Sequence, residues 1–190
     1  MKEVLGINAS PRIRGNSRFL MSLFTGMMEQ KGYETKVLNA TDLEINPCIG
    51  CGHCETKGVC VFKDDFSQIV LPEIMKADII AIGSPVYFYA FPAKIKALID
   101  RIQVMWSRKY RLKLDEFSGR TRKGVLMAVG ATGGKDLFDG LDLTARYFFD
   151  AADISSVLSL CYRNIDEKGG MEHHPAVHDD MEKLVSDLAD

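Results

Sequence analysis

This sequence of 190 residues has no long apolar run and no excess of charge of either sign. A helix that spans a membrane needs about eighteen or more consecutive apolar residues, and no such stretch occurs. Lys and Arg number 24 against 26 Asp and Glu, so the net charge of -2 lacks the basic excess typical of nucleic-acid-binding proteins. The first residues, MKEVLGINASPR, pass from two charged residues into a short β-type run without a long apolar stretch, so no secretory leader is expected. We therefore expect a cytoplasmic protein with neither a membrane nor a nucleic-acid partner.

Cysteine is also scarce, but its distribution is uneven. Four of the five cysteines lie between Cys48 and Cys60, and the fifth, Cys161, stands alone in an apolar run. Thiols stay reduced in the cytoplasm, so close spacing there favours metal or redox chemistry over disulfide bonds. Cys161 is interpreted as a small residue that fills the core.

Short apolar runs alternate with longer segments of helical period, which is the pattern of βαβ units around a parallel sheet. Strands are predicted at residues 3–8, 33–38, 78–83, 124–129 and 155–161. Helices are predicted at residues 18–30, 92–105 and 141–152 and from Pro175 onward. A further helix is predicted after an N-cap at Asp64 or Asp65, and Pro72 should bend it. Segment 42–60 is rich in Gly and Cys and is expected to be irregular. No repeat or linker divides the chain, so one α/β domain should span residues 1–190.

The segment from Ser10 to Ser17 follows the first predicted strand and opens directly into a helix. Its hydroxyl, amide and guanidinium groups suit a phosphate, because helix-start N–H groups and the helix dipole favour an anion. Gly15 would allow close approach of the backbone, and Arg12 adds a positive charge. The segment matches neither G-x-G-x-x-G nor G-x-x-x-x-G-K-[ST], which argues against a Rossmann dinucleotide site and a nucleoside triphosphatase. Alternatively, Asn16 and Ser17 only cap the helix.

Two further loops should meet the first loop, because the carboxyl ends of all strands in a parallel sheet lie at the same edge. Ligands bind at this edge, where the strand order reverses. Three consecutive aromatic residues, from Tyr87 to Tyr89, follow the third strand and would form either a wall for a flat ring or a subunit interface. The glycine-rich stretch 130–134 follows the fourth strand and would be either a close ligand contact or a mobile turn. Phosphate donors, an aromatic wall and a glycine loop on one crevice together indicate FMN.

The chain resembles the NADPH-dependent FMN reductase group of flavodoxin-like proteins through the ordered motifs Ser10-Pro11-Arg12, Gly15-Asn16-Ser17, Gly83-Ser84-Pro85-Val86-Tyr87 and 130–134. The resemblance implies a flavodoxin-like three-layer sandwich whose five-stranded parallel sheet has the order 2-1-3-4-5. It implies that the FMN phosphate is held by Ser10, Arg12, Asn16 and Ser17. The ribityl chain and ring would be flanked by Pro85, Val86, Tyr87 and Phe88, and the isoalloxazine approached by Ala131, Thr132, Gly133 and Gly134. Family members form dimers or dimers of dimers, so a homo-oligomer is expected.

The cysteine loop, residues 47–61, has the pattern C-x2-C-x2-C-x5-C, formed by Cys48, Cys51, Cys54 and Cys60. Its last spacing is longer than that of bacterial ferredoxins, and a compact single-cluster site is the better match. Structural zinc, a redox dithiol and free thiols are the alternatives, although zinc sites usually separate two C-x2-C pairs by a longer insert. With this loop included, the chain most resembles the iron–sulfur flavoproteins, which implies that all four cysteines bind one [4Fe–4S] cluster. His53, inside the loop, is expected to face solvent.

The most basic stretch runs from Arg108 to Lys123 and is expected to be a solvated loop. The alternative is a docking site for an acidic electron donor or for the phosphate of a pyridine nucleotide. The adjacent His173 and His174 are expected at the surface, because neighbouring residues rarely point at one metal centre.

These features predict an FMN-dependent oxidoreductase, in which a ferredoxin-type donor reduces the cluster and electrons pass to FMN and then to an acceptor. FMN would supply the chemistry, so no catalytic side chain is expected. The alternative is an NAD(P)H-dependent FMN or quinone reductase with structural or metal-free cysteines. A flavin-binding redox sensor or carrier without turnover is a third hypothesis.

Overall fold

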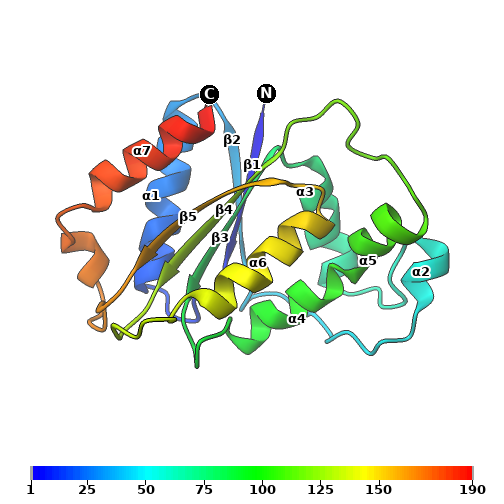
Figure 1. Ribbon diagram of the computed structural model, residues 1–190, viewed down its shortest axis with the longest axis horizontal. Coiled ribbons are helices and arrows are strands. Elements are labelled where there is room, and N and C mark those ends of the chain that lie inside the picture. Colours follow the sequence, from blue (N-terminus) through cyan, green and yellow to red (C-terminus); the bar gives the residue numbers. More distant parts are fainter. Residues whose placement is uncertain (1, 190) are drawn as a thin grey trace.

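The protein, described by a computed structural model over residues 2–189, is built around a five-stranded parallel sheet (Figure 1). The strand order is β2-β1-β3-β4-β5, which confirms the prediction. The strands are β1 Glu3–Asn8, β2 Glu34–Asn39, β3 Ile79–Pro85, β4 Lys123–Val129 and β5 Ser156–Tyr162. Each begins and ends within about two residues of its predicted position, because turn residues bound each apolar run.

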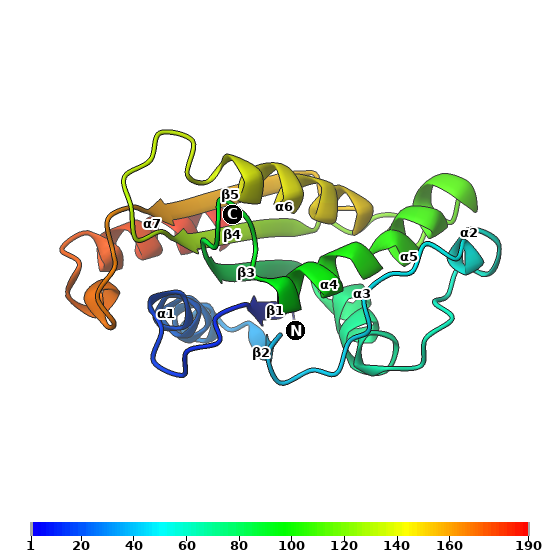
Figure 2. The ribbon, with the colours of Figure 1, turned by 90° about the horizontal axis from the view of Figure 1, so that it is seen from below.

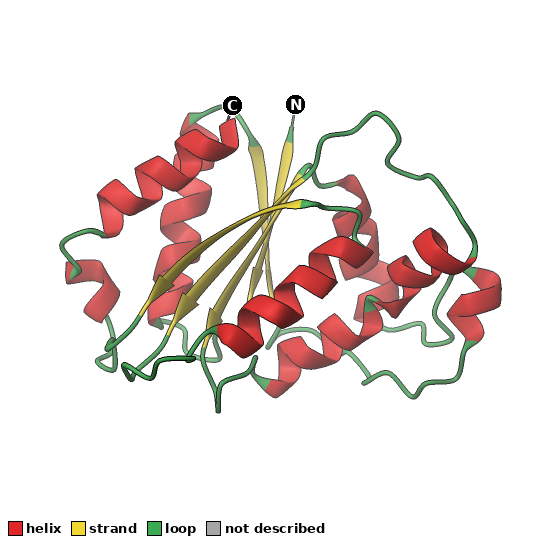
Figure 3. Ribbon diagram, viewed as in Figure 1, coloured by secondary structure: helices red, strands yellow, loops and turns green. Residues whose placement is uncertain are grey.

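Helices cover both faces of the sheet and give the expected three-layer sandwich (Figures 2 and 3). One face is covered by α1 Asn16–Gln30 and α7 Val177–Ala189. The other face is covered by α3 Leu71–Lys76, α4 Ala93–Arg101 and α6 Asp139–Ala151. Among residues 2–189, no helix combines the length and the apolar character that a membrane span requires.

The central strand β3 is buried on both faces. Ile80 and Ile82 pack into the core under α3, α4 and α6, whereas Ile79 and Ala81 pack under α1 and α7. This is why the strand has a continuous apolar sequence rather than an alternating one. In the register of the sheet, Gly83 lies between Asn8 of β1 and Met127 of β4. The loops that follow these three strands therefore start at the same edge.

The segment from residue 93 to residue 111, which we call the helical arm, is longer than the predicted helix 92–105. After α4 the chain continues through α5 Gln103–Trp106 into a π-helical turn, Ser107–Arg111. A π-helical turn departs from the 3.6-residue period, so apolar spacing places the end of the helix too early. The start of the basic stretch is therefore helical rather than a loop.

Arg122, also expected in the solvated loop, is buried and only 4% exposed. Its guanidinium donates hydrogen bonds to the backbone carbonyls of Ile74, Ala77 and Ala152, at the carboxyl ends of α3 and α6. It also lies 4.0 Å from the centre of the Phe117 ring. Burial lowers the pKa of Arg122 to about 10. This arginine donates hydrogen bonds to carbonyls at two helix ends, a role that a charge pattern does not reveal.

The region around the cysteine loop also differs in two details from the prediction. A short helix, α2 His53–Lys57, lies within the segment expected to be irregular. The helix after the loop starts as a π-helical turn, Phe66–Val70, and no aspartate side chain caps it. The carboxylate of Asp65 instead accepts a hydrogen bond from the Glu44 N–H at 2.7 Å, and that of Asp64 pairs with the helical arm.

Candidate functional site

The loops after β1, β3 and β4 converge on a pocket of about 110 Å³ at the carboxyl edge of the sheet. Predicted site residues that line it are Ser10, Arg12, Asn16, Ser17, Pro85, Val86, Tyr87 and Ala131. Phe88, Thr132, Gly133 and Gly134, also predicted, are not among its lining residues. The convergence follows from the parallel sheet, while the binding role of each residue stays a prediction.

The start of α1 borders this pocket and has no side-chain cap. Gly15 is the N-cap residue, and no side chain caps the helix there. The alternative that Asn16 and Ser17 only cap the helix is therefore not what the structure contains. The first backbone N–H groups of an uncapped helix, together with the helix dipole, suit an anionic group such as a phosphate.

The loop between β1 and α1 is held by its own polar groups. The Asn8 side chain accepts a hydrogen bond from the Ser10 N–H at 3.3 Å, and the Ser10 hydroxyl accepts one from the Arg12 N–H at 3.2 Å. A Cβ atom on Gly15 would lie 2.5 Å from the Ser10 Oγ, so a larger residue would displace the Ser10 hydroxyl. Arg12 is exposed at the rim, where its guanidinium can reach a bound anion.

Asn16 has a role that the sequence did not indicate. Its side-chain amide donates to the Glu167 carbonyl at 2.8 Å, and its Oδ1 accepts from the Met171 N–H at 3.2 Å. Both polar ends of the side chain therefore hold the segment after β5. That segment adds Ile165 and Asp166 to the pocket lining. Neither was predicted, because no motif distinguishes them.

The aromatic loop is a tight hairpin turn. Tyr87 and Ala90 exchange two backbone hydrogen bonds of 3.0 Å, and the two residues between them have positive φ angles of 49° at Phe88 and 60° at Tyr89. Asn and Gly are the usual residues at these positions, so two aromatic residues there are strained. Phe88 is fully exposed at the tip. Such strain is often retained at functional sites.

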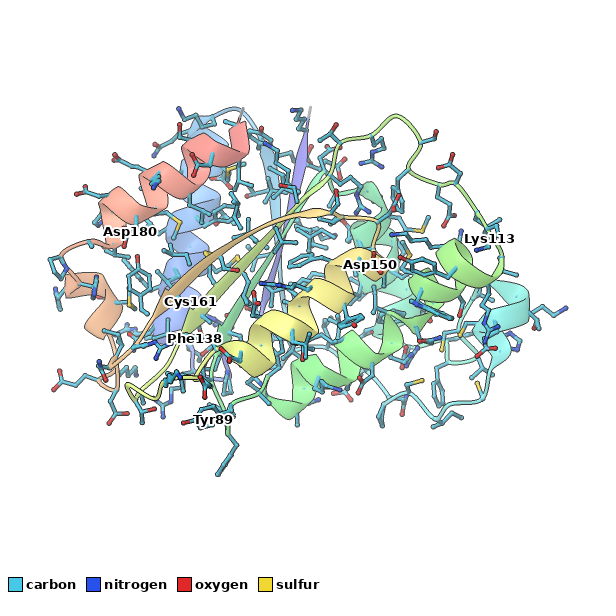
Figure 4. All side chains as sticks on the ribbon, in the orientation of Figure 1. Tyr89, Lys113, Phe138, Asp150, Cys161 and Asp180 are labelled. Carbon is cyan, nitrogen blue, oxygen red and sulfur yellow. The ribbon has the colours of Figure 1, made fainter. Side chains whose placement is uncertain are left out.

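The glycines of the 130–134 loop serve packing within the protein. A Cβ atom on Gly134 would lie 2.6 Å from the Tyr89 hydroxyl, and one on Gly133 would lie 2.8 Å from the Asn164 side chain. Arg163 donates to the Gly134 and Lys135 carbonyls and fixes the loop from β5. Figure 4 shows Tyr89 and Phe138 at this edge of the sheet. The glycines thus allow the hairpin to pack against this loop.

The four clustered cysteines line a second, larger pocket of about 400 Å³. Cys48 and Cys51 are exposed, whereas Cys54 and Cys60 are half-buried. The loop curves around the pocket because Gly50, Gly52 and Gly58 adopt φ angles of 65°, 71° and 66°. His53 is exposed and does not line the pocket, as expected.

The thiols share this pocket without forming a site for a single metal ion. Within the described residues, no three His, Cys, Asp or Glu side chains are close enough together to hold one ion. Tetrahedral zinc thiolate sites need sulfur atoms less than about 4 Å apart, since each Zn–S bond is about 2.3 Å. A four-iron cluster is several ångströms across and holds its thiolates further apart. Four thiolates are by their chemistry a donor set for an iron–sulfur cluster, but within the described residues their sulfur atoms are not gathered around one metal centre.

A buried ion pair ties both ends of the cysteine loop to the helical arm. Arg101, only 1% exposed, donates to the Asn46 carbonyl at 2.7 Å and to the two Asp64 oxygens at 2.9 and 3.0 Å. Burial alone would raise the pKa of Asp64, but hydrogen bonds from Arg101 and Asn46 outweigh it and lower that pKa to about 2. Asp64 is therefore ionised at neutral pH, and Arg101 fixes the loop's two ends together.

The remaining cysteine and the two adjacent histidines lie outside both pockets. Cys161, on β5, is half-buried against the core, and burial raises the pKa of its thiol to about 11. This agrees with its interpretation as a core residue. His173 is exposed, and His174 packs edge-on against the Tyr162 ring.

Comparison with known proteins gives one family and several relatives. The family model described as NADPH-dependent FMN reductase matches residues 2–164. An iron–sulfur flavoprotein of Methanocaldococcus jannaschii is 39% identical over 136 residues, which cover 70% of this chain and 66% of that protein. An iron–sulfur flavoprotein of Archaeoglobus fulgidus is 36% identical over 123 residues, which cover 65% and 60%. The matches thus span less than two thirds of these two relatives.

The fold has the same arrangement as solved oxidoreductases that use NADH or NAD(P)H. An NAD(P)H:quinone oxidoreductase from Methanothermobacter marburgensis superposes with a TM-score of 0.71 at 16% identity, over 100% of this chain and 98% of that one. An NADH:FMN oxidoreductase in its apo form gives 0.68 at 12% identity, over 100% and 89%. At these identities the likeness shows the fold alone.

Proposed function

The chain belongs to the NADPH-dependent FMN reductase family; from this we propose that it is a flavin-dependent oxidoreductase that moves electrons through a [4Fe–4S] cluster and FMN to an acceptor. The cluster would lie in the cysteine loop and FMN at the carboxyl edge of the sheet. FMN supplies the redox chemistry when bound, and the protein binds and orients it. Accordingly, no side chain is assigned as a catalytic acid, base or nucleophile.

The FMN site is supported by the pocket where the three loops meet. The uncapped start of α1 offers N–H donors to the phosphate, and Arg12 offers the countercharge. Ser10 and Ser17 add hydroxyl groups on the same wall. Pro85 to Tyr87 would then flank the ribityl chain and ring. Asn16 would act indirectly, because its amide already holds the segment that closes the pocket.

The cluster rests on one observation, namely that all four clustered thiols line a single wide pocket. The printed names of the relatives, iron–sulfur flavoprotein, agree with it. A plain NAD(P)H-dependent FMN or quinone reductase with metal-free cysteines is the second candidate. The family description favours it, since that description names NADPH as the reductant.

The proposed partners follow from the same reasoning. A ferredoxin-type protein would donate electrons in the first candidate function, and NAD(P)H in the second. A second copy of the chain would cover the exposed aromatic residues of the hairpin, giving a homodimer or a dimer of dimers. Nucleic acid and membranes are not proposed as partners.

The decisive experiment compares wild-type protein with Cys54→Ala and Cys161→Ala, all purified without oxygen. Iron, sulfide and FMN are measured, and flavin reduction is followed with a reduced ferredoxin, with NADPH and with dithionite. Cys54→Ala should lose the iron, keep FMN, and respond to dithionite but not to ferredoxin. Cys161→Ala should behave as wild type, because Cys161 lies outside the cysteine pocket. Wild-type protein that holds no iron but turns over NADPH would establish the second candidate instead.

A further inference from the structure

A buried serine of the helical arm contacts one of the four clustered cysteines. Ser107 has no exposed surface and lies at the start of the π-helical turn Ser107–Arg111. Its hydroxyl donates a hydrogen bond to the Cys54 sulfur at an Oγ–Sγ distance of 3.5 Å. A buried hydroxyl needs a partner, because leaving it unpaired costs about 1–3 kcal/mol. Here its side-chain partner is the Cys54 sulfur.

The contact is held in place on both sides of α2. Arg108, the next residue, donates from Nη1 to the Gly58 carbonyl at 2.8 Å, at the carboxyl end of α2. Leu112 packs beside Gly58, where a Cβ atom would lie 3.1 Å from its side chain. At the other end of the loop, Arg101 fixes Asn46 and Asp64. The distance between Ser107 and Cys54 is therefore set by the fold rather than by one flexible contact.

Ser107 is the first residue of the π-helical turn. Such turns are uncommon, and they occur frequently at functional sites. This one follows α5 and brings Ser107 and Arg108, which are consecutive in sequence, into contact with two points of α2.

We propose that Ser107 is a positioning residue that acts through Cys54 and raises the reduction potential of the iron–sulfur centre. This inference rests on the proposed function. Reduction adds one negative charge to the centre, and a hydrogen bond to a ligand sulfur stabilises that charge. Hydrogen bonds to the sulfurs are among the features that set cluster potentials. Burial strengthens the effect, since a hydrogen bond is stronger in surroundings of low polarity.

The test is a potentiometric titration of anaerobic, iron-loaded protein, followed by low-temperature EPR of the reduced cluster. Ser107→Ala removes the donor and little volume. At a fixed potential, the ratio of reduced to oxidised cluster should fall about threefold. This corresponds to a midpoint potential about 30 mV more negative for a one-electron couple. The midpoint potential of FMN, read from the visible spectrum in the same titration, should not change, because the two pockets share no lining residue.

Ser67→Ala is the matched control. The hydroxyl of the half-buried Ser67 donates to the Phe62 carbonyl at 2.7 Å. This variant therefore also loses a serine hydrogen bond beside the same loop, but the lost bond is to a carbonyl oxygen and not to sulfur. Its cluster potential should equal that of wild type. Ser107→Thr keeps the hydroxyl and should restore the wild-type potential.

Three results would overturn the inference while leaving the proposed function intact. These are an unchanged potential in Ser107→Ala, an equal shift in Ser67→Ala, and loss of iron from Ser107→Ala alone, which would make Ser107 necessary for holding the cluster rather than for its potential. Wild-type protein without iron after anaerobic loading would instead refute the cluster itself.

Discussion

Arg12 and Arg101 illustrate how differently single arginines act in this protein. Arg12 is exposed at the rim of the sheet-edge pocket, whereas Arg101 is buried and pairs with Asp64. The position of the first at the pocket could be predicted from sequence, because it follows the first strand beside a helix start, and its role toward an anion stays a prediction. The second could not, because nothing in the segment after Pro92 distinguishes Arg101 from a solvated residue.

Arg12→Ala should weaken FMN binding by more than tenfold, or above about 1.4 kcal/mol, because it removes the countercharge of the phosphate. Arg14→Ala is the matched control, since Arg14 is exposed in the same loop but does not line the pocket. Fluorescence titration of the apo-protein with FMN measures both. Equal losses in the two variants would mean that Arg12 contributes only general charge.

Asp64 should make the protein sensitive to acid. Its pKa is about 2 in the folded protein against an ordinary value of 3.8, so the folded state binds the proton less readily than the unfolded state. The stabilisation, roughly 2 kcal/mol, is complete above about pH 5 and is lost as the pH falls through 4 toward 2. Urea unfolding at pH values from 7 to 3 measures this loss.

Asp64→Asn should remove that acid-dependent component and also lower stability at pH 7, because it leaves the buried Arg101 without its ionic partner. Asp136→Asn, at an exposed position, should change neither. If the loss of stability in acid persists in Asp64→Asn, carboxylates other than Asp64 cause it.

At the scale of elements, two helical glycines should respond oppositely to the same substitution. A Cβ atom on Gly140, in α6, would lie 2.3 Å from the Tyr89 carbonyl oxygen, whereas one on Gly26, in α1, would meet nothing within 4 Å. Gly26→Ala should therefore stabilise the protein by about 0.5–1 kcal/mol through helix propensity. Gly140→Ala should destabilise it, because the hairpin must move. Thermal and urea unfolding measure the change in the free energy of unfolding for each variant. If both substitutions stabilise the protein, the hairpin moves at no cost.

The elements also show where sequence reasoning works and where it fails. β3 could be located because an apolar run between turn residues has few other interpretations. The helical arm could not be followed past residue 105, since its π-helical turn has no sequence pattern of its own. The contacts of Ser107 and Asn16 depend on residues roughly 50 and 150 positions away, so local patterns contain no information about them.

At the scale of the whole molecule, the exposed aromatic residues predict self-association. The hairpin abuts the start of α6, and Tyr87, Phe88 and Tyr89 are exposed together with Leu143 and Tyr147 of that helix. Light scattering should give a mass at least twice that of the 21.2 kDa chain. Tyr147→Glu should reduce the mass, because it places a charge in this apolar surface.

Leu114→Glu is the control for this prediction. Leu114 is 45% exposed but lies beyond the helical arm, away from the hairpin, so its substitution should leave the mass unchanged. A monomeric wild-type protein at micromolar concentration, with FMN bound, would contradict the proposed assembly.

The pairing of Arg101 with both ends of the cysteine loop has a consequence for how such proteins diversify. Asn46 and Asp64 meet at one guanidinium, so the chain between them starts and ends at nearly one point beside the helical arm. A segment attached in this way can be lengthened, deleted or transplanted without changing the length of any strand. Evolution could thus add or remove the cysteine loop in one insertion or deletion, while the sheet-edge pocket is inherited unchanged.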